Sequence, residues 1–489
     1  MSHQALPSKK TKIVCTIGPA SQSQAVLEQL IVSGMDIARV NFSHGDLDSH
    51  RQVIANVRAA AAATGHRVAI MGDLPGPKMR IGLLEEEPIQ LERDRLIILQ
   101  PGSFTGNAAR VAMSFAELPR VVRPGNMIYV NDGFIQLEVV RVQGDEVHCR
   151  VRAGGELRSR KGVNFPGIDL GISAFTDQDR EFLAFAAAQE LDAVSQSFVQ
   201  DGDDIFAVRR AAAELGYAPF LIAKIERARA LDRLDDILAA ADGLMVARGD
   251  LGVEVPFEEI AILQKTLISK ANLQGKPVIT ATHMLESMIS NRRPTRAEVS
   301  DVSNAILDGT DCVMLSGETS IGSFPVDAVA AMAAIATYTE AHRPTHPADS
   351  LVKADTAAQQ AGSGKNISIS LYLAFQALHP DMVFVPSRTG ATARLLARFH
   401  LPVWIVALCQ TEKACQELMF SYGVACVYEP MPREVWGHYV TTWLAHQGIP
   451  AQLVLLTEMS SVLRRRDTTH IEIIDLREGE DAAGDPQFV

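Results

Sequence analysis

The sequence has few cysteines and none of the spacings that would give them a structural task. Only six cysteines occur in 489 residues, with no CxxC pair and no cluster of metal-ligand type. Cys15 and Cys312 lie inside apolar runs, where a free thiol behaves as a small hydrophobic side chain. This pattern excludes a disulfide-stapled scaffold and indicates a reducing compartment.

Long apolar segments are also missing. The N-terminal sequence MSHQALPSKKTK has no apolar core of the signal-peptide type. No uninterrupted apolar stretch reaches the roughly 18 residues that a bilayer-spanning helix needs. We therefore expect a cytoplasmic protein without a membrane partner.

Positive charge is in deficit. Lys and Arg total 46 against 58 Asp and Glu, which gives a net charge of −12. Proteins that coat nucleic acids carry the opposite surplus, so we expect no nucleic-acid partner. Any site for an anionic substrate must then be locally basic against the field of the whole chain.

What is present is typical of a large globular protein. The hydrophobic share is 47% and the charged share 21%, which excludes a disordered or fibrous chain. At roughly 150 residues per domain, the length suggests about three domains.

Short, almost continuously apolar runs alternate with helical patterns through the first two thirds of the chain. Such runs suit strands buried on both faces of a parallel sheet. They are Lys12–Gly18, Asp36–Phe42, Val68–Leu74, Ala193–Phe198, Phe220–Glu226, Gly243–Ala247, Pro277–Thr282 and Asp311–Ser316. Eight such units predict a (β/α)₈ TIM barrel. We expect Asp177 and Asp201 to be helix N-caps, and single helices over 228–240 and 257–273.

The spacing breaks once. About 120 residues separate the third and fourth runs, so a domain is inserted there. Within it, Met127–Val130, Phe134–Val142 and Glu146–Arg152 alternate apolar and polar residues, with turns at Asn131–Gly133 and Gly144–Asp145. This predicts an all-β lid domain at the rim of the barrel.

After about residue 342 the pattern changes again. Arg343–Ala358 has the composition of a linker, and strand-like runs come later at Met382–Pro386, Pro402–Leu408 and Gln452–Leu456. The predicted architecture is therefore an α/β chain in three parts. These are a barrel (1–73 and 169–342), an inserted all-β lid (74–168) and a C-terminal open α/β regulatory domain (343–489).

The carboxyl ends of barrel strands are where barrel enzymes carry their chemistry. Glu226 and Asp250 end adjacent predicted strands, which lie about 4.8 Å apart. Two such carboxylates can share a hard cation such as Mg²⁺, although they can also be solvated acids. Lys224 favours the metal site, because residues i and i+2 of a strand share a face. An ammonium beside a metal-bound diacid stabilises a moving phosphoryl group.

Three further cations are candidate anion binders. Arg39 ends the second predicted strand, where its guanidinium can hold a phosphate through two hydrogen bonds. Arg80 and Lys161 belong to the inserted segment. Each alone is compatible with a surface ion pair, but together they supply the local positive field.

These motifs together resemble one family. In chain order they are NFSHG (41–45), GDLPGPKMR (72–80), KGVN (161–164), KIE (224–226), MVARGDLG (245–252), TATHMLESMI (280–289), PTRAE (294–298) and LSGET (315–319). Their order and sequences resemble those of pyruvate kinase, over about residues 10 to 340. The resemblance implies transfer of a phosphoryl group from phosphoenolpyruvate to ADP, giving pyruvate and ATP, by a homotetramer.

The resemblance also implies roles for individual residues. Lys224, Arg39 and Thr282 are the implied catalytic residues, and Thr282 also helps to relay a proton to the enolate carbon. Substrate is implied to contact Arg39, Lys224, Gly249, Asp250 and Thr282. The implied nucleotide-facing residues are Asn41, His44, Arg80 and Lys161. Glu226 and Asp250 are implied to hold Mg²⁺ or Mn²⁺.

One departure from the family pattern concerns its monovalent cation. The matching positions here are Asn41, Ser43, Asp73 and Leu74, and the leucine lacks the hydroxyl that relatives supply. Lys78 stands where K⁺-dependent relatives carry Glu. A fixed ammonium supplies the charge that K⁺ would bring, so we expect activity without K⁺, unless Lys78 is only a charge on the rim.

Two other positions bear on control. Ser387, Arg388, Thr389, Gly390 and Thr392 resemble the family's phosphate loop for an effector, or are an ordinary strand-to-helix turn. The later glycine-rich effector loop is not evident, so a sugar monophosphate or a nucleotide is as plausible an effector as a sugar bisphosphate. His283 replaces the usual Gln and is interpreted as a hydrogen-bonding residue, a titrating relay being the alternative.

Two rival functions remain at this point. One is a Mg²⁺-dependent lyase or aldolase acting on a 2-oxo acid. Such an enzyme would use the two carboxylates, but it would not need Lys224 beneath a lid that covers a nucleotide. The other is a sugar-phosphate sensor with an inactive barrel. The intact Lys224, Glu226, Asp250 and Thr282 argue against a sensor.

Overall fold

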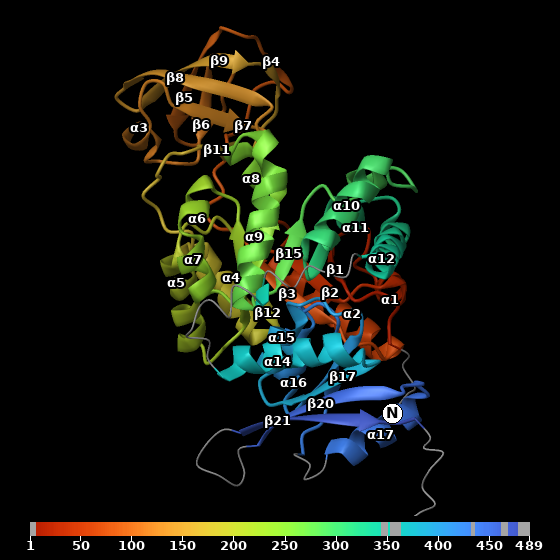
Figure 1. Cartoon of the computed structure of the whole chain (residues 1–489). Helices are drawn as coiled ribbons and strands as arrows, with labels where there is room; N and C mark the ends of the chain where they lie inside the picture. Colours follow the sequence, from red (N-terminus) through yellow and green to blue (C-terminus); the bar gives the residue numbers. More distant parts are fainter. Residues whose placement is uncertain (1–5, 344–350, 353–362, 432–435, 461–467, 478–489) are drawn as a thin grey trace, which may run out of the picture.

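Three bodies are stacked along the molecule in the computed structural model (Figure 1). The structure describes residues 6–343, 351–352, 363–431, 436–460 and 468–477. The lid lies at one end, the barrel in the middle and the C-terminal domain at the other end. Among the described residues, no helix is both long and apolar enough to cross a membrane.

The central body is a closed barrel of eight parallel strands, all within residues 6–343. The strands are β1 (Lys12–Thr16), β2 (Ile37–Asn41), β3 (Ala69–Leu74), β12 (Ala193–Gln196), β13 (Phe220–Ile225), β14 (Gly243–Ala247), β15 (Val278–Ala281) and β16 (Cys312–Leu315). Each predicted run contains one of these strands, so the TIM-barrel prediction is confirmed. The strands are mostly apolar because one face meets the barrel interior and the other meets the surrounding helices.

The helices around the barrel largely match the predicted segments. They are α1 (Gln24–Ser33), α2 (Leu47–Thr64), α4 (Asp177–Ala188), α5 (Gly202–Glu214), α6 (Ala228–Asp232), α7 (Leu234–Ala240), α9 (Ile260–Gln274), α10 (Arg296–Asp308) and α12 (Pro325–Ala341). The single helix expected over 228–240 is divided at Arg233. The helix expected from Phe257 begins with a 3₁₀ turn, η1 (Phe257–Glu259).

One of the two predicted N-caps is wrong. Asp201 caps α5 as expected, with its carboxylate accepting from the Asp203 amide. At α4 the cap is Thr176, whose hydroxyl and the side chain of Asp179 form a reciprocal capping box. Asp177 is the first helical residue there, where its charge still complements the helix dipole.

The lid is a β-rich body between β3 and α4, with one short helix, α3 (Leu118–Val121). Its strands are β4 (Ile89–Leu91), β5 (Leu96–Pro101), β6 (Arg110–Met113), β7 (Met127–Val130), β8 (Ile135–Gln143), β9 (Glu146–Ala153), β10 (Gly155–Leu157) and β11 (Val163–Asn164). They form a six-stranded sheet, β11-β7-β8-β9-β5-β6, and the pair β10-β4. The three predicted strands are β7 to β9. The others are short, and long-range pairing rather than local alternation defines them. The lid has its own hydrophobic core.

The C-terminal domain contains an open sheet. Its described strands are β17 (Met382–Ser387), β18 (Trp404–Cys409), β19 (Val424–Tyr428), β20 (Leu453–Ser460) and β21 (Thr468–Asp475), in the order β19-β18-β17-β20-β21. Its described helices are α14 (Ser363–Leu378), α15 (Ala391–Ala397), α16 (Glu412–Leu418) and α17 (Trp436–Gln447). The open α/β sheet is confirmed, although β19 and β21 had no predicted counterpart. The expected linker falls largely on 344–350 and 353–362, outside the described residues.

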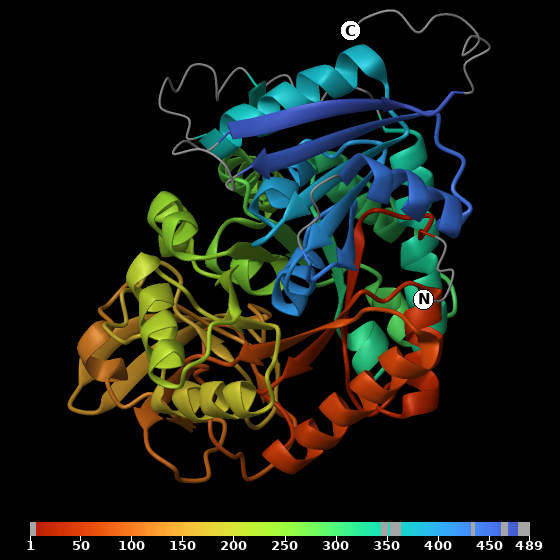
Figure 2. The same cartoon turned by 90° about the horizontal axis from the view of Figure 1, so that it is seen from below.

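The C-terminal domain closes the bottom of the barrel (Figure 2). Met419 and Phe420 belong to the same buried cluster as the inward side chains of the barrel strands. The Phe420 ring stacks on Phe220, the first residue of β13, with centroids 5.3 Å apart and planes at 15°. With the bottom sealed, the charged residues at the strand C-termini face the opposite, lid-side end.

Candidate active site

A buried cluster of opposite charges lies at the C-terminal ends of three barrel strands. Lys224, near the end of β13, has its Nζ 2.9 Å from Glu226 Oε1 and 3.4 Å from Asp73 Oδ2 at the end of β3. The same ammonium donates to Ser197 Oγ at 2.6 Å. All these groups are almost completely removed from solvent. The ammonium therefore stays charged: burial alone would lower its pKa, but Asp73 and Glu226 raise it.

Arg39, the third residue of β2, lies in the same cluster. Its guanidinium donates to Asp73 Oδ2 through Nε at 2.8 Å, and also through Nη2. Nη1 donates to Thr16 Oγ1 at 2.8 Å, while Ser195 Oγ donates to Asp73 Oδ1 at 2.7 Å. Burial would raise the pKa of Asp73, but Lys224 and Arg39 outweigh it and hold the pKa below its usual value. Asp73 therefore acts as the anion that orients both cations.

The two predicted metal ligands approach this cluster from adjacent strands. Glu226 Oε2 accepts the Phe198 amide at 2.8 Å. Asp250 lies in the first turn of α8 (Arg248–Glu254), which comes directly after β14. Burial raises the pKa of Glu226, and the nearby charge of Asp250 raises it further, whereas Lys224 opposes both. Glu226 is buried and Asp250 is partly exposed. A divalent cation would relieve the repulsion between these two like charges, so the donors fit one.

A hard cation at this point would have two protein ligands. In the part of the chain that the structure describes, no group of three or more His, Cys, Asp or Glu side chains has the arrangement of a metal site. Mg²⁺ is often held by one or two carboxylates, with substrate oxygens and water filling its other positions. The pair Glu226 and Asp250 suits that mode of binding rather than a closed structural site.

Gly249 and Thr282 form a second contact at the mouth. The Gly249 amide donates to Thr282 Oγ1 at 2.7 Å. Thr282 and His283 both adopt left-handed backbone, with φ of 69° and 53°, a conformation that costs non-glycine residues about 1–3 kcal/mol each. Arg248 holds this loop by donating to the Thr282 carbonyl at 2.8 Å and to Asp301 Oδ1 at 2.7 Å.

His283 lies at the surface of the same mouth. Its side chain is exposed. A Cβ placed on Gly249 would lie 3.5 Å from His283 Cε1, so the imidazole borders the glycine directly. The ring therefore packs beside the backbone that contacts Thr282.

A second group of cations lies where the barrel joins the lid. Arg80 and Gly162 pair across the two connecting chains, and Arg80 Nη1 donates to the Arg160 carbonyl at 2.9 Å. Partial burial lowers the pKa of His44, and the nearby charges of Arg80, Lys78 and Arg39 lower it further. The mouth is therefore locally basic, although the chain as a whole is acidic.

The residues expected at a vestigial K⁺ site do not form an open set of oxygens. Asn41 Oδ1 already accepts the Ser43 amide at 3.1 Å. Leu74 is fully buried in the barrel core. The side chain of Lys78 is exposed and extends toward the segment that connects the barrel to the lid. A Cβ atom placed on Gly162 would lie 3.7 Å from Lys78 Cε.

The predicted effector loop is not part of the barrel mouth. Ser387 to Thr392 connect β17 and α15 in the C-terminal domain, at the other end of the molecule from the lid (Figure 1). The Gly390 amide donates to Ser387 Oγ at 2.9 Å, with Gly390 at φ 75°. Arg388 and Thr389 are exposed and Thr392 is half-buried.

Sequence reasoning missed several polar groups that position the cluster. They lie at or just beyond the ends of the first and fourth barrel strands, and are Thr16, Ser195, Ser197 and the Phe198 amide. Their position in the sequence could have identified them, because they follow the same rule as Arg39, Lys224 and Asp250. All of them lie toward the carboxyl ends of barrel strands. Their small, uncharged side chains gave no chemical reason to single them out.

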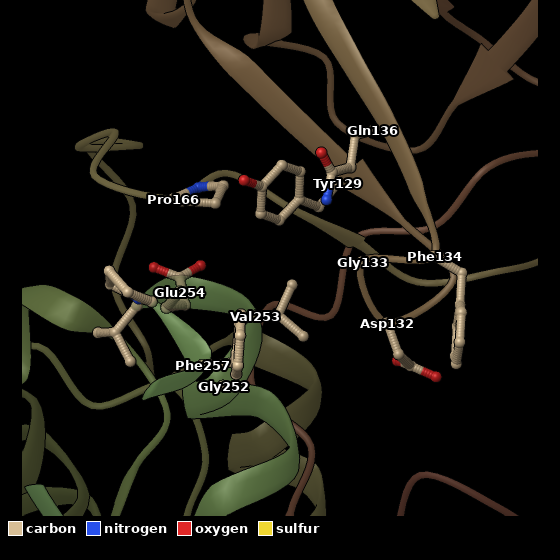
Figure 3. A pocket seen from close by; sticks show the side chains of 12 residues that line it. Tyr129, Asp132, Gly133, Phe134, Gln136, Pro166, Gly252, Val253, Glu254 and Phe257 are labelled. Carbon is tan, nitrogen blue, oxygen red and sulfur yellow. The ribbon is translucent and has the colours of Figure 1, made fainter. Parts of the chain in front are cut away.

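A cavity of about 460 Å³ separates the lid from the barrel beside this mouth. Tyr129, Gln136 and Pro166 line it from the lid side, and Val253 and Glu254 line it from α8 (Figure 3). The lid hairpin also approaches α8 closely, since a Cβ on Gly133 would lie 3.5 Å from Val253 Cγ1. The helix that carries Asp250 therefore packs beside the lid turn.

The structure combines a closed β/α barrel with buried cations and paired carboxylates at its mouth. This combination is typical of enzymes that act on phosphorylated anions with the help of a metal ion. The family model described as pyruvate kinase, barrel domain, matches residues 8–329. The model described as pyruvate kinase, alpha/beta domain, matches residues 365–460. The chain belongs to the pyruvate kinase family.

Individual relatives agree with this assignment. A pyruvate kinase of Thermococcus litoralis is 45% identical over 86% of this chain and 88% of its own length. The human pyruvate kinase PKLR is 39% identical over 88% of this chain and 78% of its own. A crystal structure of a pyruvate kinase from Cryptosporidium parvum superimposes with a TM-score of 0.88 at 34% identity, covering 96% of both chains.

Family membership establishes the coarse function. The chain is a glycolytic phosphotransferase with phosphoenolpyruvate and ADP as substrates, and it depends on a divalent metal ion. The rival lyase and the sensor with an inactive barrel are thereby set aside.

Proposed function

We propose that Lys224, Arg39 and Thr282 are the catalytic residues of this pyruvate kinase. The observation that carries this proposal is the position of Lys224 Nζ, 2.9 Å from Glu226 Oε1 in a water-excluded cluster. A fixed positive charge there stabilises negative charge as it develops on a phosphoryl group in transfer. Arg39 binds the phosphate of phosphoenolpyruvate. To do so, its guanidinium gives up some of its hydrogen bonds to Asp73 and forms hydrogen bonds to the phosphate instead.

Thr282 acts on the product side of the reaction. Its hydroxyl is held by the Gly249 amide at 2.7 Å, so both residues border the pyruvate moiety together with Asp250. Transfer of the phosphoryl group leaves an enolate, which must take a proton at carbon to become pyruvate. We assign to the Thr282 hydroxyl the positioning of that proton.

Glu226 and Asp250 are the proposed ligands of Mg²⁺ or Mn²⁺. When bound, the ion would supply positive charge close to the negatively charged oxygens of the substrate. The chain contributes two carboxylates, one of them held rigidly by the Phe198 amide at 2.8 Å. Because only these two carboxylates of the chain would hold the ion, substrate binding should depend on the metal concentration.

Asn41, His44, Arg80 and Lys161 are the proposed nucleotide-facing residues. Arg80 and Lys161 lie on the two chains that connect barrel and lid. We propose domain boundaries at 73/74, 168/169 and 342/343, with the lid (74–168) closing over the mouth. Closure excludes water, so that the phosphoryl group passes to ADP rather than to solvent.

The direct test of this function is a coupled assay with purified protein. Phosphoenolpyruvate and ADP should give ATP and pyruvate in equal amounts, and pyruvate should not appear without ADP. Release of pyruvate in the absence of nucleotide would contradict the proposed phosphoryl acceptor.

We further propose that the enzyme does not require K⁺. The proposal is supported by Leu74, which has no side-chain hydroxyl and is fully buried. It is also supported by Lys78, whose charge acts on the same rim as Arg80 and Arg39. A permanent ammonium takes over the electrostatic task of a bound monovalent ion.

The expected result is full activity in tetramethylammonium salts free of Na⁺ and K⁺. Lys78→Glu should lower that activity about tenfold or more, because reversing one charge near the site changes the interaction by on the order of 1–4 kcal/mol. KCl should restore the activity of this variant. Arg95→Glu, a charge reversal at an exposed lid residue, is the control. A wild-type enzyme that is inactive until KCl is added would contradict the proposal.

An effector loop is proposed at Ser387, Arg388, Thr389, Gly390 and Thr392. The exposed Arg388 and Thr389 lie at the tip of the turn before α15, and the hydroxyls and amides of such a turn can hold a phosphate. The expected ligand is a phosphorylated metabolite, either a sugar phosphate or a nucleotide. Arg464 to Arg466, another candidate phosphate contact, lie outside the described residues.

The effector proposal predicts activation by a phosphorylated metabolite in an assay with glucose 6-phosphate, ribose 5-phosphate, fructose 1,6-bisphosphate and AMP. Arg388→Ala should raise the activation constant about tenfold, because a charge-assisted contact to phosphate is lost. Basal activity should not change. Arg477→Ala, which removes another exposed arginine of the same domain, should leave activation intact. Equal responses of both variants would contradict the assignment.

We also propose that the enzyme is a homotetramer and that it is located in the cytoplasm. Both rest on membership of this family of glycolytic enzymes rather than on an interface. Measuring the mass in solution by light scattering checks the assembly.

A further inference from the structure

The two chain segments that connect the barrel to the lid meet at one buried carboxylate. Asp179, in the first turn of α4, is completely buried. Its Oδ1 accepts the Gly76 amide at 3.0 Å, two residues beyond the end of β3, where the first segment leaves the barrel. Its Oδ2 accepts the Thr176 amide at 2.8 Å and the Thr176 hydroxyl at 2.7 Å, where the second segment returns. One side chain therefore holds both segments.

A second buried side chain ties the returning segment to the strand ends of the barrel. Gln196 is the last residue of β12 and is almost completely buried. Its Nε2 donates to the Ala174 carbonyl at 2.8 Å and to the Ser197 carbonyl at 3.0 Å. The Ser197 amide donates to the carbonyl of Leu74, the last residue of β3, at 3.3 Å. The backbone at Ser197 is therefore bonded to the start of the first segment and, through Gln196, to the second.

Gly76 packs directly against the same backbone. Its φ of 62° lies in the left-handed region that favours glycine. A Cβ placed on it would lie 3.0 Å from the Ser197 carbonyl oxygen and 3.3 Å from the Ala174 carbonyl oxygen. A side chain at this position would have to displace backbone atoms. Close packing therefore couples the position of the first segment to that of Ser197.

Ser197 and Phe198 in turn position the charged groups at the mouth. Ser197 Oγ accepts from Lys224 Nζ at 2.6 Å, and the Phe198 amide donates to Glu226 Oε2 at 2.8 Å. Phe198 has a left-handed φ of 58°, a strained conformation for a non-glycine residue that its surroundings must maintain. A shift of the connecting segments would therefore reach Lys224 and Glu226 through only two residues.

We propose that Asp179 is a positioning residue that couples the lid to the catalytic cluster. Its carboxylate holds both connecting segments, and Gly76 transmits their position to the Ser197–Phe198 backbone. The inference rests on the proposed closure of the lid over the mouth. With both segments held, the closed lid excludes water while the charged groups of the cluster are in place.

Loosening the segments has a chemical consequence. Water that enters the mouth takes the phosphoryl group in place of ADP. The bond between phosphorus and the enol oxygen breaks, and a bond forms between phosphorus and the oxygen of water. One proton of the water stays on the phosphate and the other ends on the enolate carbon, so the products are inorganic phosphate and pyruvate. Release of phosphate therefore reports the loss of coupling.

The division of phosphoenolpyruvate between ADP and water tests the proposal. ATP, pyruvate and inorganic phosphate are measured together at saturating ADP and Mg²⁺. Asp179→Asn keeps the shape of the side chain, but its NH₂ group donates and cannot accept, so the bonds to Gly76 and Thr176 cannot both survive. The ratio of phosphate to ATP should rise about tenfold or more, because small displacements far from the chemistry have effects of that size. Partial unfolding lowers both products alike and leaves the ratio unchanged.

Asp311→Asn is the matched control for this change. Asp311 is also a buried carboxylate that accepts two backbone amides, those of Val278 and Tyr422, each at 2.9 Å, but it lies at the bottom of the barrel. This variant should unfold at a lower temperature without a change in the ratio of phosphate to ATP. A ratio that rises equally in both variants, or in neither, overturns the proposal.

Gly76→Ala tests the transmission to the cluster separately. The added Cβ presses on the Ser197 carbonyl, so the Mn²⁺ concentration for half-maximal rate should rise about tenfold. Gly216→Ala is the control, because Gly216 has a similar φ of 67° but a Cβ there would meet no atom within 4 Å. It therefore adds the same backbone strain without the contact. Equal Mn²⁺ activation in these two variants would show that Gly76 transmits nothing to the cluster.

The wild-type enzyme separates failure of this inference from failure of the proposed function. Pyruvate and phosphate released by the wild type without ADP would contradict the proposed function, and this inference with it. A wild type that makes only ATP, beside an Asp179→Asn variant that also makes only ATP, would contradict the inference alone.

Discussion

Replacing Lys224 with methionine should lower kcat by about 10³-fold or more. The side chain keeps much of its length and loses its charge, so the effect reports the charge stabilisation of the phosphoryl group in transfer. The ammonium is held between Glu226 and Asp73 at 2.9 and 3.4 Å, and methionine supplies no charge at this position. Single-turnover measurement of ATP formation isolates the chemical step.

The same substitution also removes a partner from two buried carboxylates, which costs stability on the order of 3–5 kcal/mol. Lys9→Met controls for this. Lys9 is likewise buried, with Nζ 2.5 Å from Asp36 Oδ2, but at the opposite end of the barrel. Both variants should unfold at lower temperature, yet only Lys224→Met should lose kcat. Comparable activity in the two variants would remove Lys224 from the catalytic set.

Replacing Glu226 with glutamine should weaken activation by the divalent ion about 10²-fold or more, because one of two protein carboxylates becomes a neutral amide. The Glu226 carboxylate accepts the Phe198 amide at 2.8 Å, and an amide oxygen can keep that bond. The expected signature is a higher concentration of Mn²⁺ for half-maximal rate, and weaker Mn²⁺ binding when measured directly by electron paramagnetic resonance.

Asp192→Asn is the matched control for this change. Asp192 is a largely buried carboxylate that accepts the Ile70 amide at 2.7 Å. Burial raises its pKa to about 6, but it lies at the other end of the barrel. Its neutralisation should leave Mn²⁺ binding unchanged. Unaltered Mn²⁺ binding in Glu226→Gln would show that the ion is held elsewhere.

Much of the barrel and of its mouth was predictable because the relevant signals are local. A strand such as Gly243–Ala247 is apolar at every position, since helices cover it outside and the core fills it inside. The rule that barrel chemistry lies at the carboxyl ends of the strands then located Lys224, Glu226 and Asp250 without knowledge of any contact. Short lid strands such as β10 and β11 carry no such pattern, because distant partners define them.

The same division applies to polar contacts. Nothing local indicates that Ser195 donates to Asp73, 122 residues earlier, at 2.7 Å. The capping of α4 by Thr176 depends on hydrogen bonds that a neighbouring polar residue such as Asp177 could also have made. Close competition between such alternatives limits prediction at element boundaries.

The sequence by itself determined the order of the strands, the insertion after the third, and the residues delivered to one end of the barrel, because periodicity and chain order are properties of the chain alone. Only the tertiary structure decided which charges meet. Arg39 and Lys224 share Asp73, and Phe420 packs on Phe220 at the bottom of the barrel. Those contacts join residues far apart in sequence, and burial, which sets their electrostatic strength, exists only once the chain has folded.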